Sequence, residues 1–140
     1  MNIIKPENVA QFLARFYDFH DALLVTAAYD WLVGGGTCIS VKMETRDQQA
    51  GGHSFVRLRI SEPEEVVFRE VNTSLQMLKG LRVKWFDDLV WLSFQEYSSQ
   101  IETVEDFRNS YFYVAGQVCF WEIIPKETIL GGWIPEAKSR

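Results

Sequence analysis

The chain has 140 residues and a net charge of −5; 47% of its residues are hydrophobic and 24% are charged. These values exclude a disordered chain, which needs low hydrophobicity and high net charge, and they disfavour nucleic acid and anionic membranes as partners, since both select basic proteins. No basic segment followed by an apolar stretch begins the chain, and the longest uncharged run, 109–121, is shorter than the roughly 20 residues of a membrane-spanning helix. The sequence therefore predicts a cytoplasmic protein with no membrane contact.

A helix is predicted first, over residues 5–16. Pro6 suits a first helical position, and the apolar residues that follow recur at the spacing of one helix face, at Val9, Phe12, Leu13 and Phe16. Residues 22–31 follow as a run of β-forming and small apolar residues, which predicts a largely buried strand.

Alternation of apolar and polar residues predicts strands at 37–45 and 54–61. Runs of β-forming residues predict the remaining strands, at 66–71, 81–86, 89–94, 108–115 and 117–124, of which the last two are rich in aromatic residues. Asp87 and Asp88 separate two of these runs and predict a hairpin turn. Gly116 is predicted to turn the last two strands onto each other, and the polar stretch 95–106 is predicted to be a loop.

These elements predict an α+β fold, in which an N-terminal helix packs on a curved, mostly antiparallel sheet of about seven or eight strands. A sandwich and a partly open barrel both stay open as forms of that sheet. We expect one domain over 1–140, with a helical segment 1–17, a sheet core 22–124 and a tail 125–140. The tail contains the apolar residues Ile129, Leu130, Trp133 and Ile134. It either folds back on its own domain or reaches a second subunit, and Trp133 is our candidate for an interface in a homodimer.

Motifs for known chemistry are missing from the sequence. It contains no phosphate-binding glycine loop, no G-x-S-x-G nucleophile elbow and no C-x-x-C or H-E-x-x-H metal motif. We therefore predict no metal, no cofactor and no catalytic residue. Cys38 and Cys119 are predicted to be reduced and buried, although the sequence does not give their separation in space.

Two groups of polar residues stand beside apolar sequence. Asp18, His20 and Asp21 lie between the predicted helix and first strand, where a histidine flanked by carboxylates suits a general base. The alternative, which we favour, is a structural junction whose polar groups bond to the backbone. Arg108 and Glu122 lie at comparable distances from Gly116 and are expected to face each other as an ion pair, either structural or part of a site.

Basic residues occupy solvent-facing positions of the predicted strands, at Lys42, Arg57, Arg59, Arg82 and Lys84. Gathered on one face, they would steer an acidic protein partner. The alternative is an ordinary solvated face with cross-strand pairs such as Glu44 with Arg57 or Arg59.

Two stretches carry a resemblance. Phe19-His20-Asp21-Ala22 opens the first predicted strand, and Arg108-x-Ser110 precedes a strand that ends in Trp121-Glu122. In these short stretches the chain resembles small uncharacterised bacterial domains, some of them similar to immunity proteins that neutralise polymorphic toxins. The resemblance implies a binding protein. Our leading hypothesis is a non-catalytic protein-interaction or immunity-like protein, and the alternative is a small-molecule binder or enzyme with a pocket in the curved sheet near Asp18, His20 and Asp21.

Overall fold

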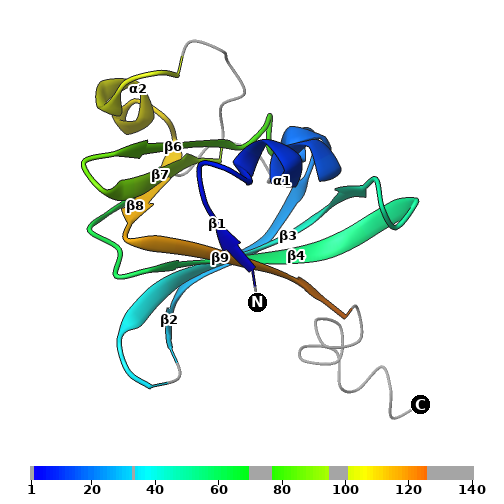
Figure 1. Cartoon of the computed structure of the whole chain (residues 1–140), viewed down its shortest axis with the longest axis horizontal. Coiled ribbons are helices and arrows are strands. Elements are labelled where there is room, and N and C mark those ends of the chain that lie inside the picture. Colours follow the sequence, from blue (N-terminus) through cyan, green and yellow to red (C-terminus); the bar gives the residue numbers. More distant parts are fainter. Residues whose placement is uncertain (1, 33, 70–76, 95–100, 126–140) are drawn as a thin grey trace.

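The computed structural model describes residues 2–32, 34–69, 77–94 and 101–125, and there it shows two antiparallel sheets (Figure 1). The order of the five strands in sheet A is β1 (Asn2–Ile4), β9 (Val118–Ile124), β4 (Gly52–Ser61), β3 (Thr37–Asp47) and β2 (Leu23–Trp31). The order of the four strands in sheet B is β5 (Glu65–Phe68), β8 (Phe112–Gly116), β7 (Leu89–Ser93) and β6 (Arg82–Phe86). A mostly antiparallel fold is confirmed. The expectation of one curved sheet is wrong, because the described strands form two separate sheets.

The core lies between the two sheets. Val41 and Leu58 from sheet A and Leu92 and Val114 from sheet B belong to one buried cluster, and each is fully inaccessible to solvent. Alternation predicts this arrangement for β3 and β4, because every second side chain of a strand points to the same face. Phe16 from the N-terminal segment is also fully buried in this cluster.

The helices differ from the prediction. The N-terminal helix α1 spans only Val9–Arg15 and continues into a 3-10 turn, η1 (Tyr17–Phe19), while residues 2–4 form strand β1. A second helix, α2 (Val104–Arg108), begins inside the predicted loop and covers the outer face of sheet B, where Phe107 packs with Trp91 in a second apolar cluster. Among the described residues, no helix is long and apolar enough to cross a membrane.

A bent two-stranded ribbon joins the sheets. Strand β4 runs on into β5 and β8 runs on into β9, while β4 pairs with β9 in sheet A and β5 with β8 in sheet B. At the bend, the backbone N–H of Glu64 donates to Ala115 O (2.8 Å) and that of Gln117 donates to Ser61 O (2.9 Å). The predicted hairpin at Gly116 is therefore wrong, because the chain changes sheets there instead of reversing.

Strand β2 is not the largely buried strand that its composition predicts. It lies at the edge of sheet A, and none of its nine residues is buried: six are exposed and three are partly covered. By contrast, the hairpin at Asp87 and Asp88 is confirmed between β6 and β7, and both turn residues have the positive φ angles (51° and 65°) of a tight β-turn. The predicted tail 126–140, with Trp133, lies outside the described residues.

Candidate functional site

The outer edge of β2 is paired with no strand among the described residues. One side of β2 pairs with β3, and on the other side the described chain supplies only an isolated bridge between Leu23 and Met77. The N–H of Leu32 donates to Gly36 O (3.1 Å) at the end of the β2–β3 ladder. Because bonded and non-bonded pairs alternate in an antiparallel ladder, the N–H groups of Ala27 and Tyr29 point away from β3. This edge can therefore accept a further strand.

Large apolar side chains are exposed along the same edge. Trp31 is 76% exposed and Tyr29 is 69% exposed, and across the opening Phe68 of β5 is 49% exposed. Scattered exposed apolar residues are ordinary on a protein surface, but Tyr29 and Phe68 line one groove beside this edge, and exposed apolar residues gathered at a strand edge are typical of an interaction site.

A groove of about 310 Å³ lies between β2 and the β5–β8 pair of sheet B. Leu24 and Tyr29 form its sheet A wall, and Val66, Phe68 and Phe112 form its sheet B wall. Every described residue that lines the groove is uncharged, and the polar side chains among them are the hydroxyls of Thr26 and Tyr29. The groove therefore suits an apolar group, since a charged one would lose its hydration there without gaining an ionic partner.

The predicted basic residues do not share one face. Lys42, Arg57 and Arg59 lie on β3 and β4 of sheet A, whereas Arg82 and Lys84 lie on β6 of sheet B. Two of the sheet A arginines are also neutralised: Arg57 Nε donates to Glu122 Oε2 (2.9 Å), and Arg59 lies 3.7 Å from Asp30. The cross-strand pair predicted for Glu44 is also different, since Glu44 lies opposite Phe55 and 3.7 Å from His53.

Asp18, His20 and Asp21 lie in a backbone turn. Asp18 and Asp21 have φ angles of 57° and 64°, and Tyr17 and Phe19 are also in the left-handed region. The turn is fixed by Leu81 N, which donates to Asp18 O (2.8 Å), and by Asp21 N, which donates to Leu78 O (2.9 Å). The imidazole of His20 lies 3.3 Å from the Asp21 carboxylate, and both side chains are more than half exposed. The walls of the groove include none of the three residues.

Arg108 lies at the end of helix α2 and Glu122 in strand β9 of sheet A, and the predicted ion pair between them does not form. Arg108, at the end of α2, donates from Nε to Glu65 Oε1 (2.8 Å) on β5, while Glu122 accepts from Arg57. Tyr113 also donates to Glu65 Oε1 (2.8 Å), and these bonds, from Arg108 above all, lower the pKa of Glu65. Arg108 therefore fastens α2 to sheet B.

Neither cysteine is placed for chemistry. Cys38 lies opposite Ser61 of β4 and Cys119 lies opposite Ile60, so the two side chains point to opposite faces of sheet A. Both thiols are fully buried, and burial raises the pKa of each. In addition, no group of three or more potential metal ligands gathers within the described ranges.

We expect both thiols to be unreactive in the native protein, because the thiolate is the reacting species and neither sulfur is accessible. Titration with Ellman's reagent should detect almost no thiol in the folded chain and two after denaturation in guanidinium chloride. A thiol that reacts at once with the reagent in the native state would contradict these positions. Loss of either thiol when the folded monomer is treated with an oxidant would contradict them as well.

Sequence reasoning did not identify the groove. Its walls come from strands that are far apart in the chain, so no local spacing marks them. One signal was available: β2 carries Thr26, Ala27 and Ala28 in its middle, where a strand buried on both faces carries large apolar residues.

Comparison with known proteins found no family model, curated protein or solved structure that matches the chain.

Proposed function

We propose that this is a non-catalytic protein-interaction protein that binds an extended, apolar strand of a partner along the edge of β2. The observation that carries the proposal is the edge of β2, which no described strand covers, beside a groove whose described lining residues are uncharged. An added strand gains backbone hydrogen bonds from the edge, and its alternate side chains enter the groove. Neutralisation of a toxin, which the resemblance to immunity proteins implies, would be one instance of such binding.

The uncharged walls of the groove indicate which kind of partner segment would bind there. An acidic partner draws little support, since Arg57 and Arg59 are already paired and Arg82 and Lys84 lie on the other sheet. A strand with apolar residues at alternate positions matches both the free backbone groups and the uncharged walls. An enzymatic function draws no support from Asp18, His20 and Asp21, which stand at the surface away from the groove walls.

Selection from a phage-displayed library of linear peptides tests this proposal. We expect enriched peptides to alternate apolar residues, and to bind about tenfold more weakly to the Ala27→Pro variant. Proline removes the outward N–H of residue 27 and places its ring where the added strand would lie, while the bonds of β2 to β3 stay intact. Fluorescence anisotropy with one synthetic peptide gives the two dissociation constants.

Lys42→Glu is the matched control, since Lys42 lies on the outward face of the neighbouring strand β3 and lines no part of the groove. It should leave the affinity unchanged, and circular dichroism should show all three proteins folded. Failure to enrich any peptide, or equal affinity for Ala27→Pro, would refute strand binding at β2. Concentration-dependent dimerisation that Ala27→Pro abolishes would instead identify a second copy as the occupant.

A further inference from the structure

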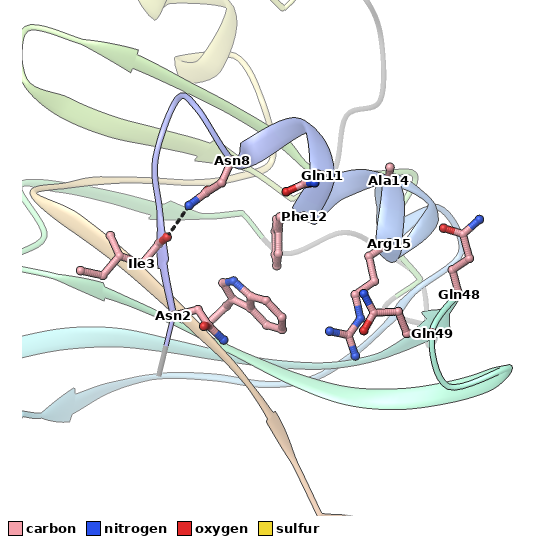
Figure 2. Close-up of a pocket in the computed structure, with 10 residues that line it drawn as sticks. Asn2, Ile3, Asn8, Gln11, Phe12, Ala14, Arg15, Gln48 and Gln49 are labelled. Atoms are coloured by element: carbon pink, nitrogen blue, oxygen red, sulfur yellow. Dashed lines mark hydrogen bonds between the residues drawn. The ribbon is translucent and has the colours of Figure 1, made fainter.

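A second and larger pocket, of about 510 Å³, opens between α1, β1, the tip of the β3–β4 hairpin and Trp121 of β9 (Figure 2). Its volume falls within the range of small-molecule sites. Half of its lining residues carry a carboxamide side chain: Asn2, Asn8, Gln11, Gln48 and Gln49. This pocket shares no residue with the groove beside β2.

Most of these carboxamides are available to a ligand. Only Asn8 is used by the fold: its Oδ1 accepts from Lys5 N (2.9 Å) and its Nδ2 donates to Ile3 O (3.0 Å). Within the described chain, the side chains of Asn2, Gln11, Gln48 and Gln49 make no hydrogen bond. Each amide offers both a donor and an acceptor, so together they match groups that do both, as a hydroxyl does.

The amides come from different sides of the pocket. Figure 2 shows Asn2 on one side, Gln48 and Gln49 on the other, and Phe12 between them. Asn2 belongs to β1, Gln11 to α1, and the other two glutamines to the hairpin tip. A ligand in the pocket would therefore be met by hydrogen-bonding groups from three separate elements.

The pocket carries no unbalanced charge. Arg15 is the one charged side chain among the described residues that line it, and its guanidinium is held by Asp47 through Nε (2.9 Å) and Nη2 (3.0 Å). An anionic ligand would have to compete with that carboxylate for Arg15. A purely apolar ligand would cover the amides and leave them without the hydrogen bonds that they make to water.

Two aromatic rings, together with Ile3 and Ala14, form the apolar part of the pocket. Phe12 is buried and Trp121 is half-buried, and their ring centroids lie 5.1 Å apart. Aromatic faces pack against C–H groups, and the ring of a sugar has C–H groups on its faces and hydroxyls around its rim. Aromatic rings flanked by uncharged donors and acceptors are complementary to such a molecule.

We propose that this pocket binds an uncharged saccharide, with the sugar face against Phe12 and Trp121 and its hydroxyls bonded to Asn2, Gln11, Gln48 and Gln49. The site does not depend on the strand-binding function proposed for β2, so either can fail without the other.

Saturation-transfer NMR with the full chain tests the proposal, using cellobiose, maltose, lactose and diacetylchitobiose as neutral probes and sialyllactose as a charged one. We expect at least one neutral sugar to bind with a dissociation constant below about 10 mM. In the ¹H–¹⁵N spectrum, that sugar should shift the indole N–H of Trp121 and the side-chain amides of Gln11 and Gln49.

The double variant Gln11→Ala, Gln49→Ala should bind the same sugar about tenfold more weakly, because two neutral hydrogen bonds are lost. Gln117→Ala removes an exposed glutamine at the bend between the sheets and should bind as the parent does. Both variants should melt at the parent's temperature, since none of these side chains is bonded within the described chain. Absence of binding by every neutral sugar at about 10 mM, tighter binding of sialyllactose, or undiminished binding by the double variant would overturn the proposal.

Discussion

Replacing Asp47 by alanine is expected to lower the free energy of unfolding by about 3–5 kcal/mol. The carboxylate is 2% exposed and accepts hydrogen bonds from Arg15 Nε (2.9 Å), Arg15 Nη2 (3.0 Å), Ser54 Oγ (2.6 Å) and Gln49 N (3.0 Å). Alanine removes both acceptor oxygens, and with them all four hydrogen bonds, and leaves the partly buried guanidinium of Arg15 without its counter-charge. Urea unfolding followed by far-ultraviolet circular dichroism measures the loss.

Glu122→Ala is the matched control. It also removes a carboxylate from an arginine pair, but the side chains of Glu122 and Arg57 are 27% and 21% exposed, so water can replace much of what is lost. We expect a decrease of about 1 kcal/mol or less. If the free energy of unfolding decreased equally in the two variants, the burial of Asp47 would make no contribution to stability.

The same carboxylate makes the stability depend on pH. The hydrogen bonds from Arg15, first among the causes, hold the pKa of Asp47 well below its usual range. Folding therefore releases protons below about pH 4, where the unfolded carboxyl is protonated and the folded one is not. The contribution of Asp47 is complete above that pH and decreases as the pH falls toward the folded pKa. In Asp47→Asn, the loss of stability between about pH 4 and pH 2 should be smaller than in the parent.

Gly116→Ala should lower the free energy of unfolding by about 1–3 kcal/mol. A Cβ atom at this position would lie 2.5 Å from Cγ2 of Ile60 and 2.8 Å from the carbonyl oxygen of Ser61. Neither neighbour can withdraw easily, because Ile60 is in the core and Ser61 O accepts the bond from Gln117 at the bend. Urea unfolding provides the measurement here as well.

Gly52→Ala is the control for this substitution. Like Gly116, Gly52 lies at the end of a strand, in its case β4 of sheet A, but an added Cβ would have no atom within 4 Å, and its φ angle is not in the left-handed region. Its stability should change by no more than about 0.5 kcal/mol. A Gly116→Ala protein as stable as Gly52→Ala would mean that the two sheets approach less closely at the bend than the structure shows.

The contrast between Asp87-Asp88 and Gly116 shows what the sequence can predict. The hairpin at the two aspartates is local, because the turn and both of its strands lie within a dozen residues, and its pattern is sufficient to predict it. Glycine at 116 is equally suited to a turn and to a close approach between strands. Only the positions of Ile60 and Ser61, more than fifty residues earlier, decide between these two roles.

Short elements were missed for a related reason. Strand β1 has three residues and is held by pairing with β9 at the far end of the described chain, which no local pattern encodes. Helix α2 has five residues, too few to show a helical period, although Thr103 and Asp106 form a capping box that was readable in the sequence. Both elements matter for Arg108: α2 places it beside Glu65 of β5 in sheet B, whereas the bend carries the chain into sheet A, where Glu122 pairs with Arg57.

The candidate site could not be predicted from the sequence mainly because the order of the strands in the sheets was not known. A run of small and apolar residues such as 22–31 fits both a buried central strand and an edge strand beside a groove, and hydrophobicity does not separate the two. The basic residues posed the same problem, since alternation shows that Lys42 and Lys84 face solvent but does not show that they belong to different sheets.

The position of β9 has a consequence for the order of folding. It lies between β1 and β4, so the last strand of sheet A to be synthesised is an inner strand of that sheet. Its residues 119–121 pair with residues 2–4 of β1. Strands β2, β3 and β4 can form a meander as soon as they are made, but that meander lacks its neighbour until β9 has been synthesised. Such long-range pairing gives the chain a high contact order, which slows folding. A growing chain on the ribosome would thus expose the edge of β4, and with it a surface for mispairing, from the synthesis of β4 until β9 has been made.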